Sequence, residues 1–294
     1  MRAAVVQLNS TSDKSRNLAA AERLVRAAAA DGAELIALPE KWNLLAEGEE
    51  LLAGAEPLDG PSLSAARGWA RELGIHLLAG SVCEAAPGPT GRNVKDDLTY
   101  RPVGPRAFNT SVLIGSDGED LAAYRKIHMF DVDVGGVAYR ESEHEEPGEE
   151  IVVAALGDPG ADVSLGLSVC YDLRFPELYR ILAIRGARIL LVPAAFTKIT
   201  GQAHWELLIR ARAIENQAFV IAADQIGRHP DDKESFGGSM IVDPWGEVLA
   251  RAPDEETFIA ADLELARQDE VREQLPSLAN RMPATYVWPQ EVSA

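Results

Sequence analysis

Cysteine and positive charge are scarce in this sequence, and each shortage excludes a class of protein. The 294 residues include two cysteines, Cys83 and Cys170. No disulfide framework is therefore expected, and the reducing cytoplasm is the expected location. Lysine and arginine number 28 against 46 aspartates and glutamates, which gives a formal net charge of -18. Nucleic acids and anionic membranes are bound by basic surfaces, so we expect neither as a partner.

Long apolar runs and cofactor motifs are also missing. No run approaches the length of a membrane span, and the apolar run at the N-terminus is too short for a signal peptide. The sequence contains no G-x-G-x-x-G or Walker phosphate loop, and its five histidines lack metal-ligand spacing such as H-E-x-x-H. We therefore expect no metal and no other cofactor.

Short apolar runs alternate with segments of helical periodicity along most of the chain. The hydrophobic content of 47% is enough for a large core. The patterns predict strands over residues 3–8, 34–39, 75–82, 108–114, 121–125, 188–194, 219–223, 239–242, 248–251 and 257–263. They predict helices over residues 18–30, 62–73, 204–217 and 265–274. Such a mixture favours an α/β fold in which helices cover the faces of sheets.

Three segments fall outside this alternation. Residues 84–106 are rich in proline, glycine and charge, which predicts a surface excursion or flap. Residues 131–148 are polar and contain glycine, which predicts a loop. We expect residues 1–275 to form one domain. The tail, residues 276–294, carries Tyr286 and Trp288 among prolines, and we expect it to lie on this protomer or on a neighbour.

Cys170 ends an apolar, β-branched run that is typical of a buried strand. The run begins at Asp162, turns polar at Cys170 and reaches Pro176, which suits the first turn of a helix. A cysteine at the carboxyl end of such a strand lies at the sheet edge where ligands bind. Free cysteine is also a common buried hydrophobe, and taken alone that is the commoner role.

Two charged residues, Glu40 and Lys126, also end predicted strands. An acid, an ammonium and a thiol at one sheet edge are groups that can together catalyse acyl transfer. Glu40 could accept the thiol proton and later deliver it to a leaving amine. Lys126 could stabilise the tetrahedral oxyanion together with the backbone N–H of Tyr171. Glu141 could hold the Lys126 ammonium in place.

Each of these charged residues could instead have an ordinary structural role. Glu40 and Lys126 could be solvated loop residues, which is the commoner fate of such side chains. Glu141 is one of a charged cluster with Glu143, Glu145 and Glu146. On spacing alone, both interpretations stay open.

Three segments resemble the catalytic signatures of the nitrilase superfamily of carbon–nitrogen hydrolases, and they occur in the order of that family. They are Leu38-Pro39-Glu40, Tyr124-Arg125-Lys126-Ile127-His128 and the run from Gly166 to Glu177. Supporting similarity lies in residues 193–197, 200–206, 210–217 and 243–246, and the resemblance runs from residue 2 to about 275. It implies a Glu40, Lys126 and Cys170 triad, assisted by Glu141. It also implies a four-layer α-β-β-α sandwich that dimerises through helices beside the active site.

Within the superfamily, residues 195–197, 210–217 and 225–229 resemble the amidase branch, which contains deaminated glutathione amidases and omega-amidases. This implies hydrolysis of a small carboxamide to a carboxylate and ammonia through a cysteine thioester. The alternatives are an N-carbamoyl amino acid hydrolase, a nitrilase, or a catalytically silent binding scaffold. One departure is Gly238, which stands where these amidases usually carry histidine.

Residues that select the substrate are expected near the nucleophile. Arg174 could pair with a substrate carboxylate in a bidentate manner, or equally with Asp172 or Glu177 in a structural salt bridge. Phe196 and Thr197 are expected to line the pocket. His204, at the start of a predicted helix, is expected to be a cap or an interface residue rather than a catalyst.

Overall fold

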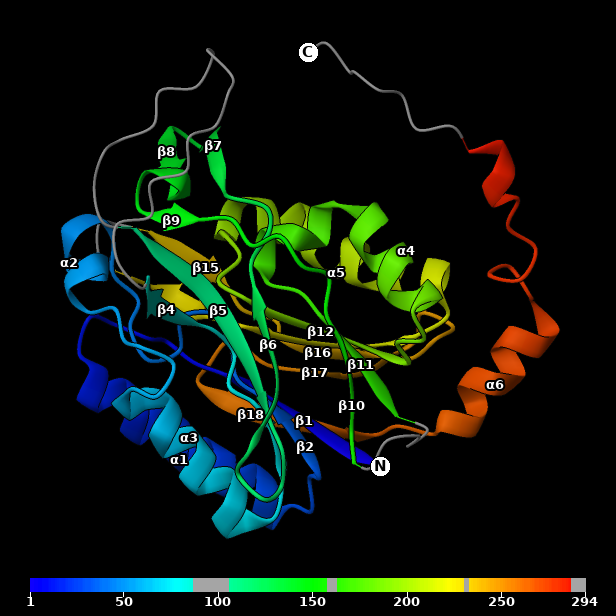
Figure 1. Ribbon diagram of the computed structural model, residues 1–294, viewed down its shortest axis with the longest axis horizontal. Coiled ribbons are helices and arrows are strands. Elements are labelled where there is room, and N and C mark those ends of the chain that lie inside the picture. The colour runs from blue at the N-terminus through cyan, green and yellow to red at the C-terminus, as the bar shows by residue number, and fades with distance from the viewer. Residues whose placement is uncertain (87–105, 158–162, 230–232, 287–294) are drawn as a thin grey trace.

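The computed structural model describes residues 1–86, 106–157, 163–229 and 233–286 (Figure 1). Most of the excursion expected over residues 84–106, and the end of the tail from residue 287, lie outside the described residues. Two large sheets face each other. Helices α1 (Lys14–Ala30) and α3 (Pro61–Leu73) cover one outer face, and α4 (Pro176–Ile184) and α5 (Lys198–Asn216) cover the other. The predicted α-β-β-α sandwich is confirmed.

Both faces of the first sheet are apolar, because successive apolar side chains along its strands point to alternate faces. Its main path is β18 (Thr257–Asp262), β1 (Arg2–Gln7), β2 (Leu35–Ala37), β3 (His76–Leu78), β5 (Ala107–Ile114) and β4 (Val82–Ala85). Strands β6 (Asp120–Arg125) and β9 (Glu145–Glu146) also pair with β5. Ala3 and Val5 pack toward the second sheet, whereas Ala4 and Val6 pack with α1 and α3. Successive strand residues point to opposite faces, so both layers form from one strand.

The second sheet brings three parallel strands to its centre. Its order is β10 (Val153–Ala155), β11 (Ser164–Leu167), β12 (Ile189–Ala194), β13 (Phe219–Asp224), β16 (Met240–Val242) and β17 (Val248–Arg251). Strands β11, β12 and β13 pair in parallel. The chain leaves β11 just before Cys170 and leaves β12 just before Ala195. Polar side chains therefore gather at one edge, as expected for the carboxyl ends of parallel strands.

The loop predicted over residues 131–148 is wrong. The segment forms a hairpin of β7 (Asp131–Val134) and β8 (Val137–Arg140), then a 3-10 turn, η1 (Glu141–Glu143), and strand β9. Gly135 and Gly136 join the hairpin with φ of +61° and +81°, the conformation that a tight hairpin turn requires. The alternation Asp-Val-Asp-Val is a strand pattern, but its polar residues conceal it.

The single strand predicted over residues 75–82 is divided at Gly80. The backbone of Gly80 has φ of +42°, and a Cβ there would collide with the carbonyl oxygen of Pro39. The N–H of Ser81 donates to the same oxygen at 3.3 Å. Strands β3 and β4 therefore flank a turn that packs against the residue preceding Glu40.

Other elements differ in length or were missed. Helix α1 begins four residues earlier than predicted, with Asp13 as its N-cap, and α5 begins at Lys198 instead of His204. Helix α2 (Gly48–Ala53), strand β10 and the hairpin of β14 (Ile226–Arg228) and β15 (Glu234–Phe236) were not predicted. Helix α6 (Leu265–Gln274) has the predicted bounds, and a 3-10 turn, η4 (Pro283–Thr285), follows it. Most side chains of the described tail are exposed, so its packing stays a prediction.

Candidate active site

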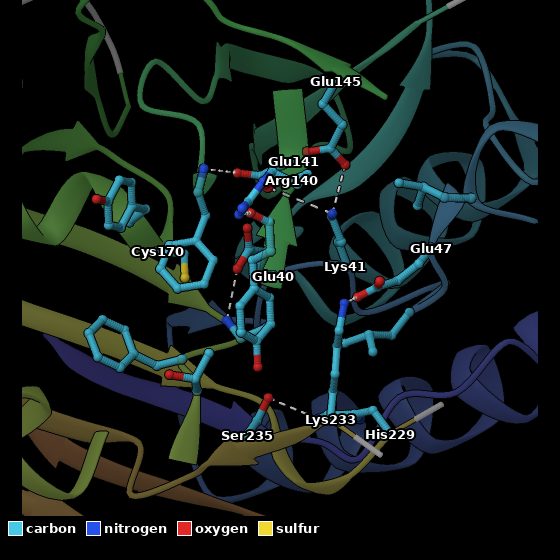
Figure 2. A pocket seen from close by; sticks show the side chains of 18 of the residues that line it. Glu40, Lys41, Glu47, Arg140, Glu141, Glu145, Cys170, His229, Lys233 and Ser235 are labelled. Atoms are coloured by element: carbon cyan, nitrogen blue, oxygen red, sulfur yellow. Dashed lines mark hydrogen bonds and ion pairs between the residues drawn. The ribbon is translucent and has the colours of Figure 1, made fainter. Parts of the chain in front are cut away.

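A cavity of about 160 Å³ opens at the edge where these strands end. All eight candidate site residues predicted from the sequence line this cavity: Glu40, Lys126, Glu141, Cys170, Tyr171, Arg174, Phe196 and Thr197. The sulfur of Cys170 and the carboxylate of Glu40 both point into the cavity (Figure 2). The structure thus brings together residues that are up to 157 positions apart in the sequence.

Cys170 begins a short 3-10 turn, η2 (Cys170–Arg174), with φ of +48°. A non-glycine residue in this left-handed region is strained and persists only where its surroundings hold it. The buried carboxylate of Asp172 holds the turn by accepting from the Val169 N–H at 2.8 Å and the Tyr124 hydroxyl at 2.7 Å. The same carboxylate lies 2.7 Å from Nδ1 of His128. The sulfur is therefore presented from a fixed turn.

Glu40 is fixed by groups from three different segments. Its Oε1 accepts from Nδ2 of Asn109 at 2.8 Å and from Nζ of Lys126 at 3.1 Å, and its Oε2 accepts from the N–H of Ala195 at 2.8 Å. Glu40 is 3% exposed and Lys126 is 2% exposed. Neither is a solvated loop charge. Asn109 was missed, although a polar residue within an apolar strand was a visible signal.

Lys126 is a buried ammonium between two carboxylates. Its Nζ donates to both oxygens of Glu141 at 2.7 Å, and Glu141 Oε2 also accepts from the N–H of Phe130 at 2.7 Å. Burial lowers the pKa of Lys126, but Glu141 and Glu40 together raise it well above the usual value. Burial raises the pKa of Glu141, but Lys126 and Lys41 outweigh it and lower that pKa. Both groups are therefore charged at neutral pH.

The thiol of Cys170 is protonated when the site is empty. Burial and the nearby Glu40 carboxylate raise the pKa of the thiol well above its usual value, against the opposing effects of Lys126 and the Ala195 N–H. A thiol in this state needs a base to become a nucleophile. Glu40 lies near enough to raise the pKa of this thiol and is therefore placed to be that base.

Arg174 has no carboxylate partner among the described residues. Its guanidinium lies 5.0 Å from the ring centroid of Phe196 and 5.8 Å from that of Tyr171. One of its nitrogens is 3.2 Å from Nδ1 of His204. The alternative salt bridge is therefore wrong for both Asp172 and Glu177, and the Asp172 carboxylate is bound by other groups. His204 lies inside α5, so its expected capping role is wrong, and the positive face of Arg174 stays open to the cavity.

The far wall of the cavity comes from segments outside the three signatures. Lys233 pairs with Glu47, and its ammonium lies 4.7 Å from the ring centroid of Tyr139. Gly238 is not among the lining residues. It has φ of +65°, and its carbonyl accepts from Nε1 of Trp205 at 2.9 Å. The departure from the family pattern at Gly238 therefore does not alter a residue that lines the cavity.

Within the described ranges, the side chains form no cluster of three or more potential metal ligands. Across the same part of the chain, every helix is too short or too polar to cross a membrane.

Comparison with known proteins assigns the family. A family model described as carbon-nitrogen hydrolase matches residues 2–273. The human protein named deaminated glutathione amidase is 41% identical over 285 residues, which are 96% of this chain and 83% of that protein. Human omega-amidase NIT2 is 38% identical over 289 residues, which are 97% of this chain and 96% of that protein. The chain belongs to the carbon–nitrogen hydrolase family.

Solved structures agree with this assignment. The C. elegans NitFhit protein gives a TM-score of 0.84 at 36% identity, covering 97% of this chain and 66% of that longer chain. A variant of the amidase from Nesterenkonia sp. AN1 gives a TM-score of 0.76 at 26% identity, covering 97% of this chain and 94% of that chain. Its structure shows covalent addition of the acetamide moiety of fluoroacetamide at the active-site cysteine. The resemblance drawn from the sequence, and with it the class of amidase, is confirmed.

Proposed function

We propose that this enzyme hydrolyses a small carboxamide bearing a carboxylate, through a thioester on Cys170. The observation that carries the proposal is the buried Glu40 carboxylate, which accepts from the Lys126 ammonium at 3.1 Å and lines the same cavity as the Cys170 thiol, whose pKa it raises. Relatives named deaminated glutathione amidase and omega-amidase support amides of that kind as substrates.

The first half-reaction makes the thioester. The sulfur of Cys170 attacks the amide carbon while its proton passes to Glu40. The oxygen that becomes negative is stabilised by the Lys126 ammonium and the backbone N–H of Tyr171. When the intermediate collapses, the carbon–nitrogen bond breaks and Glu40 returns the proton to the departing ammonia.

The second half-reaction releases the acid. Glu40, ionised again, takes a proton from a water molecule that attacks the thioester carbon. The carbon–sulfur bond then breaks, and the thiol recovers the proton from Glu40. Glu141 keeps Lys126 charged and in place in both halves, because it binds the ammonium with both oxygens.

Substrate selection falls to the wall beside the nucleophile. Arg174, which has no carboxylate partner among the described residues, binds the substrate carboxylate through charge-assisted hydrogen bonds. Phe196 and Thr197 line the space between that carboxylate and the reacting carbon. The enclosure limits the substrate to a small molecule.

The experiment is a substrate panel read by ammonia release. It comprises deaminated glutathione, alpha-ketoglutaramate, an N-carbamoyl amino acid and a nitrile, with mass spectrometry of Cys170 after mixing. We expect turnover of a carboxylate-bearing carboxamide, a transient acyl adduct, and no activity in Cys170→Ala. Turnover by that variant would overturn the thioester. Activity on the carbamoyl compound or the nitrile alone would reassign the substrate. Absence of ammonia release from every compound would favour a catalytically silent binding scaffold.

We also propose a cytoplasmic homodimer formed through α4 and α5. Large apolar side chains are exposed on this side of the single chain: Ile181 and Ile184 of α4, Leu207 and Ile214 of α5, and Trp245. Exposed apolar groups gathered on one side are typical of a protein interface. Both cysteines are free and buried, which suits a reducing compartment.

A further inference from the structure

A second ammonium, that of the partly buried Lys41, lies beside the catalytic groups and has no part in the mechanism above. Its Nζ is 2.7 Å from Oε1 of Glu145 and 3.7 Å from Oε1 of Glu141 (Figure 2). Lys41 follows Glu40 directly and has φ of +51°. Strain of this kind is costly for a lysine and clusters at functional sites.

Glu145 is completely buried, and its environment is unusual for a carboxyl group. Its Oε1 forms an ion pair with Nζ of Lys41 at 2.7 Å, but neither of its oxygens has a partner in hydrogen-bond geometry among the described residues. Two apolar residues of similar size are commonly at least as stable as a lysine and a carboxyl group buried together. Stability alone therefore does not account for Lys41 and Glu145 in this place.

The charges of the cluster show what the pair does. Glu40, Glu141 and Glu145 face Lys41 and Lys126, so the cluster is neutral only when one carboxyl group keeps its proton. Burial and Glu141 raise the pKa of Glu145 to about 8, against the opposing effect of Lys41. The neighbouring Glu145 also helps to lower the pKa of Glu141. At neutral pH, Glu145 is therefore the protonated member.

We propose that Lys41 and Glu145 are positioning residues of the active site: acting through Glu141, they hold its carboxylate ionised and bidentate on Lys126. The proposal rests on the proposed function, since it assigns the pair to the same acyl transfer. Lys41 contributes its charge, 3.7 Å from Oε1 of Glu141, and Glu145 contributes its proton. Without them Glu141 is free to turn, and Lys126 loses its direction toward Glu40 and the substrate oxygen.

The pair also causes kcat to fall as the pH becomes alkaline. The titratable groups that face Glu145 are Lys41, Lys126, Glu141 and the thiol of Cys83 on β4. The pKa of Cys83 is raised by burial to about 12, those of both lysines are raised, and that of Glu141 is lowered. Glu145 is thus the member of this group that titrates near pH 8. Its ionisation draws Lys41 from Glu141 and adds a negative charge to the site.

The test compares the double variant Lys41→Met/Glu145→Leu with a matched control, Arg106→Met/Glu146→Leu. The control removes a largely buried ion pair between Arg106, which precedes β5, and Glu146 of β9, at a distance of 3.2 Å between its charged atoms. We expect the first variant to stay folded, with kcat lower by about 10- to 100-fold. Its KM should stay within about threefold, because the wall that binds the substrate carboxylate is unchanged. The control keeps its kcat. A folded Lys41→Met/Glu145→Leu variant with the kcat of the natural enzyme would overturn the proposal.

Single variants keep the proposal testable if the double variant does not fold. Glu145→Gln retains shape and fixes the neutral form, so we expect a normal kcat at pH 7 and no loss of kcat through pH 8. An alkaline limb unchanged from the natural enzyme would count against the proposal. The rate of Cys170 alkylation by iodoacetamide, followed against pH, reports on the cluster without any amide substrate. If no amide is turned over the proposed function fails, while a shifted alkylation profile in Lys41→Met still supports the pair.

Discussion

Three donors from separate segments hold Glu40, and the proposed catalytic cycle uses both of its protonation states. Replacing it by glutamine in Glu40→Gln keeps the volume but removes the base and the acid. We expect kcat to fall by about 10²- to 10⁴-fold, the usual contribution of general acid–base catalysis. The rate of ammonia release measures kcat, and Glu146→Gln on β9 is the control variant. A loss below about threefold would show that another group moves the proton.

Arg174 allows a sharper prediction about the substrate. Arg174→Lys retains the charge but loses the planar pair of donors. We expect KM for a carboxylate-bearing amide to rise by about 10- to 100-fold, since charge-assisted hydrogen bonds contribute about 1.5–3 kcal/mol. KM for a neutral amide of similar size is expected to stay unchanged. Equal losses on both amides would assign Arg174 to the structure of the pocket.

Glu145 links folding to pH in a direction that can be worked out. Its pKa is about 8 in the folded chain against 4.5 for the free side chain. Between these values the folded state keeps a proton that the unfolded state has lost. The free energy of unfolding therefore falls as pH rises through this window, by at most about 1.4 kcal/mol per pH unit, and the fall ends near pH 8.

Glu145→Gln removes this pH dependence. Compared with the natural chain, the variant is expected to gain relative stability as pH rises from 5 to 8 and to gain no more above that. Urea unfolding at each pH measures the difference. The lowered pKa of Glu141 acts in the opposite direction, but its effect is confined to acid below about pH 4.5 and is common to both proteins. A constant difference from pH 5 to 9 would contradict the assignment of the proton to Glu145.

At the scale of elements, the turn after β3 sets the position of the loop after β2. A Cβ at Gly80 would collide with the backbone of Pro39, so Gly80→Ala must displace the residue that precedes Glu40. We expect a loss of about 3 kcal/mol or more in the free energy of unfolding, together with a lower kcat. Gly74→Ala is the matched control, because Gly74 has φ of +65° and no atom lies within 4 Å of the place a methyl group would take. That variant is expected to lose only about 1 kcal/mol and to keep its kcat.

The sequence was sufficient to predict those elements whose signals are local. The apolar run before Cys170, the proline that opens α4 and the strand before Lys126 each carry their own pattern. The features that the sequence did not reveal depend on which distant segments lie next to one another in the fold. Glu145 looks like one acid among several until β9 is placed beside β5, and the environment of Arg174 depends on α5 starting six residues earlier than the pattern suggested.

At the scale of the whole molecule, the apolar side chains of α4 and α5 give a prediction about assembly. Leu207 is 69% exposed in the single chain. Placing a charge there with Leu207→Asp is expected to convert a dimer into a monomer, because an unpaired charge in an interface is strongly unfavourable. Light scattering coupled to size-exclusion chromatography measures the mass. A natural chain that elutes as a monomer at micromolar concentration would contradict the proposed dimer.

The raised pKa of the Cys170 thiol bears on the survival of the enzyme between turnovers. Peroxides attack thiolates far faster than thiols, and over-oxidation beyond the sulfenic acid is irreversible. A sulfur that keeps its hydrogen until an amide arrives presents little to such oxidants. The same burial that makes a base necessary thus shields the idle enzyme from chemical damage.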